Sequence, residues 1–206
     1  MIAISTIVIS VYLYMEVKNF GIDTFTSPPV HHFLLPNSIR CIIAGPSGCG
    51  KTNLLVNLIL ESGWLHYDRL YIYSKSLNQD QYKVLRDWAR GINQVAGGDI
   101  ITFHDTAGDV IPVDQLTSQQ TTVLVFDDVM LESQAPIESY FARGRHNGAN
   151  CFYLTQNYFK IPNQVIRENA NMIILFGQNQ NNIYEKGIAF SIQYPVAGIN
   201  STENFC

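Results

Sequence analysis

Short apolar runs alternate with longer, partly polar stretches along most of the chain. Six runs have strand character, and each of the first five is followed by residues with helical or turn character. This order is typical of parallel βαβ units, so we predict an α/β domain with a mostly parallel sheet flanked by helices. The runs are Ser38–Ala44, Arg69–Tyr73, Ile100–Phe103, Thr121–Phe126, Cys151–Leu154 and Met172–Phe176.

The stretches between these runs predict four helices. One begins just after the first run and ends near Ser62 and Gly63, and Gly97 and Gly98 mark a turn after the second. Asp105–Thr117 is expected to be a loop with the beginning of a short helix. The other helical stretches are Gln79–Arg90, Ile137–Ala142 and Gln164–Asn169.

We divide the chain into a leader and irregular lead-in (1–36), a main domain (37–177) and an irregular tail (178–206). Ile2–Met15 is apolar but shorter than the about 20 residues of a membrane-spanning helix, and it lacks a basic start. We expect a buried strand or an added leader there, and His31 and His32 in a solvated loop. After Gly187 no closing strand or helix is expected, which leaves open a truncated or frame-disrupted copy.

Composition narrows the class of protein. Of 206 residues, 47% are hydrophobic and 15% are charged, which is typical of a folded domain with a sizeable core. The formal net charge of −4 argues against a broad basic surface for nucleic acid, although not against contact through a few loops. The four cysteines are too widely spaced for a zinc site or a disulfide framework, so we expect a reduced, intracellular setting. The length of Ile2–Met15 argues against a membrane anchor.

A glycine-rich segment follows the first strand and opens the first helix. Its sequence, GPSGCGKT, fits the P-loop pattern GxxxxGK(S/T) in the strand-to-helix context that the pattern requires. Backbone N–H groups of such a loop bind phosphate, the lysine reaches the β- and γ-phosphates, and the hydroxyl binds Mg²⁺. We therefore predict an ATP and Mg²⁺ site. Its residues are Gly45, Pro46, Ser47, Gly48, Cys49, Gly50, Lys51 and Thr52.

Asp127 and Asp128 directly follow the buried run that ends at Phe126. An acidic residue at the end of a strand next to a P-loop holds Mg²⁺ through water, and Asp127 has that position. A second carboxylate at Asp128 can orient or deprotonate the attacking water. The alternative is a strand-end turn with a helix cap, for which aspartate is also common.

Three further polar residues are candidates. Gln156 leaves the strand that ends in Leu154, at the edge where ligands gather in open α/β sheets, and it could hydrogen-bond the γ-phosphate. Arg143 and Arg145 precede that strand. Such arginines are usually solvated, but in oligomeric NTPases one of them can enter a neighbour's site and stabilise the transition state.

Four segments together resemble the poxvirus-type DNA-packaging ATPases of the FtsK/HerA superfamily, which occur in large DNA viruses, virophages and polinton-like elements. They are GPSGCGKT, VLVFDDV, RGRHNGANCFYLTQNYF and IPNQVIRENANMIILF, within about Ser38–Phe176. The P-loop is shared with many NTPases. The GRH segment, followed by a strand ending in TQ and then by Asn-Ala-Asn, is much more specific.

The resemblance implies a RecA-like core of the additional-strand type and a Mg²⁺-dependent ATPase. It also implies a homo-oligomeric ring, with a hexamer favoured, that threads viral double-stranded DNA into a capsid, with capsid or portal-vertex proteins as partners. By motif position, Asp128 takes the base position and Gln156 the sensor position. Arg143 or Arg145 is the finger that acts on a neighbour, and Arg167 matches a motif of uncertain role.

Other functions stay open at this point. A degenerate homologue or an ATP-binding switch would keep the fold without motor activity. A GTPase would need an NKxD sequence, and a small-molecule kinase would need an arginine-rich lid; the chain has neither pattern. The intact Lys51, Thr52 and paired aspartates favour hydrolysis of ATP.

Overall fold

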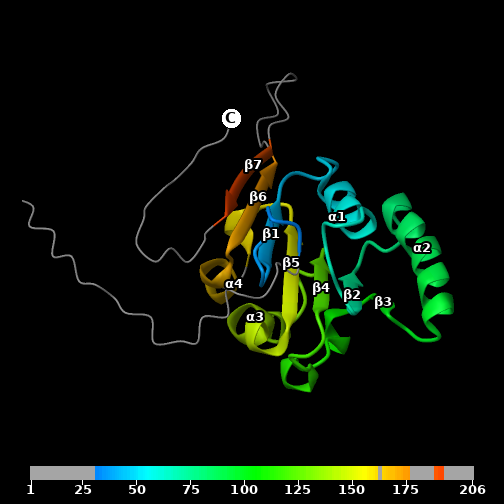
Figure 1. The fold of residues 1–206 in the computed structure, drawn as a ribbon. Coiled ribbons are helices and arrows are strands. Elements are labelled where there is room, and N and C mark those ends of the chain that lie inside the picture. Colours follow the sequence, from blue (N-terminus) through cyan, green and yellow to red (C-terminus); the bar gives the residue numbers. More distant parts are fainter. Residues whose placement is uncertain (1–30, 162–163, 177–187, 193–206) are drawn as a thin grey trace, which may run out of the picture.

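A seven-stranded sheet forms the centre of the molecule (Figure 1). The structure is a computed structural model, and it describes residues 31–161, 164–176 and 188–192. The strand order is β3-β2-β4-β5-β1-β6-β7. The predictions for the leader Ile2–Met15 concern residues outside those that the structure describes.

Six strands are parallel, as the sequence predicted. They are β1 (Arg40–Ala44), β2 (Arg69–Ser74), β3 (Ile101–His104), β4 (Thr122–Asp127), β5 (Ala149–Thr155) and β6 (Met172–Phe176). The additional-strand arrangement is confirmed, because β5 lies between β1 and β4. Neighbouring strands are about 4.8 Å apart, so this insertion separates the ends of β1 and β4 by about 10 Å.

The prediction that no strand follows Gly187 was wrong. Strand β7 (Ile188–Ile192) pairs antiparallel with β6 and extends the sheet beyond the predicted domain boundary at 177. The sequence signal was weak because five residues are too few to establish a period. An antiparallel edge strand on an otherwise parallel sheet is common in α/β folds.

Helices cover both faces of the sheet (Figure 1). Helices α1 (Lys51–Leu60) and α2 (Asp80–Ala96) pack on one face, and α3 (Ala135–Arg143) and α4 (Gln164–Asn169) lie on the other. Helix α2 continues past the predicted Arg90 and ends at Gly97, which has φ 67°. The predicted loop with the beginning of a helix contains two 3₁₀ turns, η2 (Ala107–Asp109) and η3 (Val113–Gln115).

The core has two layers because side chains alternate along each strand. Cys41 and Ile43 face the layer under α1 and α2, whereas Ile42 and Ala44 face the layer under α3 and α4. Every residue of β4 is buried, as expected for a central strand covered on both sides. The carboxyl end of β4, where the two aspartates lie, is therefore held by packing on both faces.

His31 differs from the sequence prediction of a solvated loop. Its side chain is buried, its Nδ1 accepts a hydrogen bond of 3.1 Å from the backbone N–H of His66, and burial lowers its pKa. His32 stacks on Trp64, with ring centroids 4.1 Å apart. The pair thus ties the lead-in to the segment after α1.

Among the described residues, none of the helices combines the length and the apolar character that crossing a membrane requires.

Candidate nucleotide-binding site

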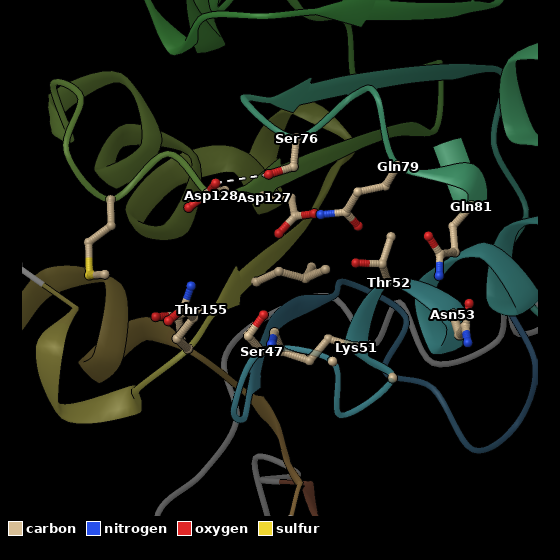
Figure 2. Close-up of a pocket in the computed structure, with 15 residues that line it drawn as sticks. Ser47, Lys51, Thr52, Asn53, Ser76, Gln79, Gln81, Asp127, Asp128 and Thr155 are labelled. Carbon is tan, nitrogen blue, oxygen red and sulfur yellow. Dashed lines mark hydrogen bonds between the residues drawn. The ribbon is translucent and has the colours of Figure 1, made fainter. Parts of the chain in front are cut away.

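The carboxyl ends of β1, β2, β4 and β5 meet around one cavity of about 320 Å³ (Figure 2). The P-loop forms one wall, and Asp127 and Asp128 lie opposite it. Ligand sites of open α/β sheets lie at this edge, and the volume is within the range of small-molecule pockets. The lining residues are Ser47, Gly48, Gly50, Lys51, Thr52, Asn53, Ser76, Gln79, Gln81, Asp127, Asp128, Met130, Leu154, Thr155 and Gln156.

The P-loop connects β1 to α1, as the motif predicted. Gly50 caps the helix with φ 107°, a conformation that a residue with a Cβ rarely adopts. The loop therefore turns sharply and leaves the first N–H groups of α1 directed at the cavity, where an anion is stabilised.

Three of the eight predicted P-loop residues do not line the cavity, namely Gly45, Pro46 and Cys49. A Cβ on Gly45 would lie 2.6 Å from Cβ of Phe176, and the Gly45 N–H donates to the carbonyl of Thr155 at 3.1 Å. These contacts fix the base of the loop against β5 and β6.

Lys51 lines the cavity at the first position of α1. Its Nζ donates to the carbonyl oxygens of Gly45 (2.7 Å) and Pro46 (2.9 Å). The ammonium group thus braces the loop from inside and lies among the groups that would contact phosphate. The long, flexible side chain allows it to turn to a phosphate oxygen.

Asp127 ends β4 and is buried, with 7% of its surface exposed. Its Oδ2 accepts a hydrogen bond of 2.7 Å from the hydroxyl of Tyr82. Burial raises the pKa of Asp127, and the negative charge of Asp128 raises it further. The hydrogen bond from Tyr82 and the positive charge of Lys51 act in the opposite direction, but the pKa stays above its ordinary value. The carboxyl group of Asp127 is therefore largely shielded from solvent, with a hydroxyl donor and charged side chains nearby.

Asp128 is the one non-glycine residue with positive φ among the described residues, at 58°. Asparagine and aspartate tolerate this conformation best, and such backbone strain clusters at functional sites. The turn exposes the side chain to the cavity, where Oδ2 accepts a hydrogen bond of 2.9 Å from the hydroxyl of Ser76 (Figure 2).

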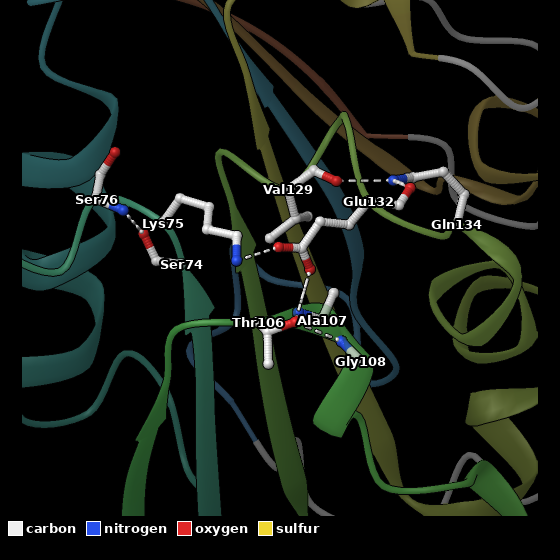
Figure 3. Close-up of polar contacts among 9 residues, drawn as sticks. All are labelled: Ser74, Lys75, Ser76, Thr106, Ala107, Gly108, Val129, Glu132 and Gln134. Carbon is white, nitrogen blue, oxygen red and sulfur yellow. Dashed lines mark hydrogen bonds and ion pairs between the residues drawn. The ribbon is translucent and has the colours of Figure 1, made fainter.

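A brace holds the loop that follows Asp128 (Figure 3). Glu132 forms an ion pair of 2.6 Å with Lys75 and accepts a hydrogen bond from the backbone N–H of Ala107. Burial acts to raise the pKa of Glu132, but the bonds from Lys75 and Ala107 outweigh it, so its pKa lies below the ordinary value. The brace joins the loop after β4 to the ends of β2 and β3.

Gln156 lies where the sequence predicted, exposed at the cavity after β5. Arg143 and Arg145 precede β5 and are not among the residues that line the cavity. Arg143 lies 3.9 Å from Asp114, and Arg145 donates to His146. Arg167 pairs within the fold, since it donates to the carbonyls of Phe159 and Ile161.

Sequence reasoning missed the contribution of the segment after β2. Ser76, Gln79 and Gln81 all line the cavity, and Tyr82 contacts Asp127 from behind it. Because β2 is parallel to β4 and adjacent to it, the rule that strand ends meet at one edge could have indicated Ser76. No sequence pattern marks Tyr82.

The donors around the cavity suit a Mg²⁺-triphosphate. Mg²⁺ prefers oxygen ligands and is bound by one or two carboxylates together with substrate phosphates. The hydroxyl of Thr52 and the carboxylate of Asp127 lie on the same cavity. Among the described residues, no group of three or more His, Cys, Asp or Glu side chains is arranged to hold a metal ion.

Comparisons with known proteins identify the fold. A scan against protein-family models found no match, and a search of curated proteins found no relative. Among solved structures, the genome packaging NTPase B204 of Sulfolobus turreted icosahedral virus 2, in complex with sulfate, matches with a TM-score of 0.50 and 14% identity over 82% of this chain and 98% of B204. The same protein in complex with AMP matches with a TM-score of 0.50 and 16% identity, over 82% of this chain and 100% of B204.

At these identities the similarity bears on the fold alone, and it spans nearly the whole of B204. The sequence motifs had independently indicated a resemblance to viral packaging ATPases. The chain therefore has the P-loop NTPase fold that is also found in a viral genome-packaging NTPase, in agreement with the FtsK/HerA-type resemblance of its motifs.

Proposed function

We propose that this protein is a Mg²⁺-dependent ATPase that moves viral double-stranded DNA into a capsid. The observation that carries the proposal is the cavity, around which the P-loop, the paired aspartates and Gln156 meet at one edge of the sheet. The fold shared with the packaging NTPase B204 supports the choice of genome packaging among the many functions of P-loop proteins.

In the proposed reaction the P-loop N–H groups and Lys51 bind the phosphates of ATP. Thr52 and Asp127 would hold Mg²⁺, which when bound neutralises charge on the phosphate oxygens. Asp128 orients the attacking water and accepts its proton, and Gln156 hydrogen-bonds the γ-phosphate or the water. Negative charge that develops on the phosphoryl oxygens is stabilised by the loop and by Lys51.

Arg143 and Arg145 enter the proposal through a neighbouring copy. Both precede β5, whereas the cavity lies at the strand's other end, about 20 Å away for seven residues. An arginine placed this way acts on the site of the next subunit in a ring, for which we favour a hexamer. Capsid or portal-vertex proteins are the proposed docking partners.

Stimulation of ATP hydrolysis by DNA tests the motor. The steady-state rate should rise several-fold when linear double-stranded DNA is added, and much less with single-stranded DNA of the same length. Size measurement with a non-hydrolysable ATP analogue should reveal a ring. Hydrolysis without any response to DNA would remove the motor and leave an ATPase, while binding without hydrolysis would favour an ATP-dependent switch.

A further inference from the structure

Tyr82 occupies an unusual position for a core residue. It lies in the first turn of α2, is fully buried, and packs in the apolar layer between the sheet and helices α1 and α2. Its hydroxyl nevertheless has a polar partner, since it donates to Oδ2 of Asp127 at 2.7 Å. The contact joins residues 45 positions apart in the sequence, so it depends on the packing of α2 on the sheet.

The bond has the form of a charge-assisted hydrogen bond. Hydroxyl-to-carboxylate bonds are short, in the range of about 2.5–2.7 Å. The hydroxyl of Tyr82 is the donor, because an ionised carboxylate can only accept hydrogen bonds. The direction of the bond is therefore fixed.

A carboxylate has two oxygens, and in Asp127 one of them, Oδ2, accepts the bond from Tyr82. Tyr82 is the one side chain that hydrogen-bonds this carboxylate among the residues the structure describes. It occupies Oδ2, while Asp127 also lines the cavity. A carboxylate held through one oxygen loses rotational freedom, and a partner that orients a metal ligand typically affects metal affinity about 10- to 100-fold.

We infer that Tyr82 is a positioning residue, which holds one oxygen of Asp127 and thereby presents the other to the cation that accompanies the nucleotide. The inference rests on the proposed function, since it concerns the cation of that same site. It adds a role for α2, a helix that carries none of the predicted motif residues. Tyr82 itself contacts neither nucleotide nor cation.

The test compares two tyrosines that each lose a buried hydroxyl. Tyr82→Phe removes the bond to Asp127 and keeps the ring. Tyr140→Phe is the matched control, because Tyr140 is also buried and its hydroxyl donates to the backbone carbonyl of Ile111, on the other face of the sheet. Mn²⁺ binding is measured by electron paramagnetic resonance at saturating non-hydrolysable ATP analogue, and analogue binding without metal is measured separately.

Tyr82→Phe should weaken Mn²⁺ binding about 10-fold or more and leave binding of the metal-free analogue unchanged. In ATP hydrolysis, the fold increase in the Mg²⁺ concentration for half-maximal rate should exceed the fold decrease in kcat. Tyr140→Phe should leave all three unchanged. Equal Mn²⁺ affinity in Tyr82→Phe and wild type would overturn the inference and leave the proposed function intact. Equal weakening in both variants would assign the effect to stability and overturn it too.

A measurement on the wild-type protein covers the case in which Tyr82→Phe does not fold. In a crystal structure with Mn²⁺ and the analogue, the Tyr82 hydroxyl should remain on one oxygen of Asp127, with the anomalous signal of Mn²⁺ on the side of the other. A hydroxyl that has left the carboxylate would contradict the inference. If the wild-type protein binds neither analogue nor Mn²⁺, the proposed function and this inference both fail.

Discussion

Asp127 and Asp128 are adjacent in sequence and have opposite environments. Asp127 is buried and held by Tyr82, whereas Asp128 is exposed on the cavity and held by Ser76. The difference follows from the backbone, because the positive φ of Asp128 turns its side chain away from the strand's core-facing alternation. In the proposed reaction, the buried carboxylate would hold the cation and the exposed one would orient the attacking water.

Asp128→Asn should separate these roles. The amide keeps the shape and a partner for Ser76 but removes the base, so kcat should fall about 10²- to 10⁴-fold while affinity for a fluorescent ATP analogue changes little. Asp87→Asn, on the exposed face of α2, is the control and should retain wild-type kcat. A kcat for Asp128→Asn within about threefold of wild type would exclude Asp128 as the base.

Gly148, in the GRHNGA segment before β5, lies where the backbone conformation and the available space both require glycine. It has φ 69°, and a Cβ there would lie 2.5 Å from the carbonyl oxygen of Gln120. The glycine therefore allows the turn into β5 to pack against the end of the loop before β4, next to the first residue pair of the two strands, Thr122 and Ala149.

Gly148→Ala should lower the free energy of unfolding by more than the about 1–2 kcal/mol that a left-handed alanine costs. Gly97→Ala separates the two effects, because Gly97 has φ 67° and open space around its Cβ position. Urea unfolding of both variants gives the comparison. Equal losses would mean that the contact with Gln120 relaxes without cost.

At the scale of the elements, the site is positioned by the carboxyl ends of the strands and by the loops that leave them. Strands β1 and β4 are held apart by β5, and the loops that leave β2, β4 and β5 each carry polar residues to the cavity. The brace around Glu132 links the loop after β4 to those after β2 and β3. Since this loop also contains Asp128, its stability limits how accurately the carboxylate is placed.

The brace predicts a pH-dependent stability. The pKa of Glu132 in the folded protein lies below its ordinary value of 4.5, so the stabilisation is complete above that value and is lost as the pH falls through the folded-state pKa. Glu132→Gln should therefore have a lower melting temperature than wild type at pH 7, with a difference that shrinks below pH ~4.5. Glu61→Gln, at the exposed end of α1, should show no such trend. A difference independent of pH would contradict an ionic brace.

Much of the architecture could be predicted from the sequence. The six parallel strands have strong signals because each is an apolar run of β-forming residues, and the P-loop motif fixes its own strand and helix. Strand β7 was missed because its five residues gain their partner only through the edge of β6. Tyr82 and the brace were missed because they join residues far apart in sequence, which local patterns do not reveal.

At the scale of the whole molecule, the candidate site lies at the carboxyl edge of the sheet. The cavity lies at the carboxyl edge, while Arg143, Arg145 and the segment around His31 lie towards the amino edge. In the proposed ring, the amino side of one copy would meet the cavity of the next. The predicted division of the chain at 36 and 177 stays a prediction, and β7 indicates that the sheet continues beyond it.

The central claim is that the P-loop and the paired aspartates form one ATP-hydrolysing site. It is tested most directly by phosphate release from ATP and Mg²⁺, comparing wild type with Lys51→Ala and with Lys83→Ala, whose lysine is exposed on α2 and pairs with Asp80. We predict hydrolysis by wild type and Lys83→Ala, and a loss of roughly a hundredfold or more in Lys51→Ala. Equal phosphate release by Lys51→Ala and wild type, or none by wild type, would contradict the claim.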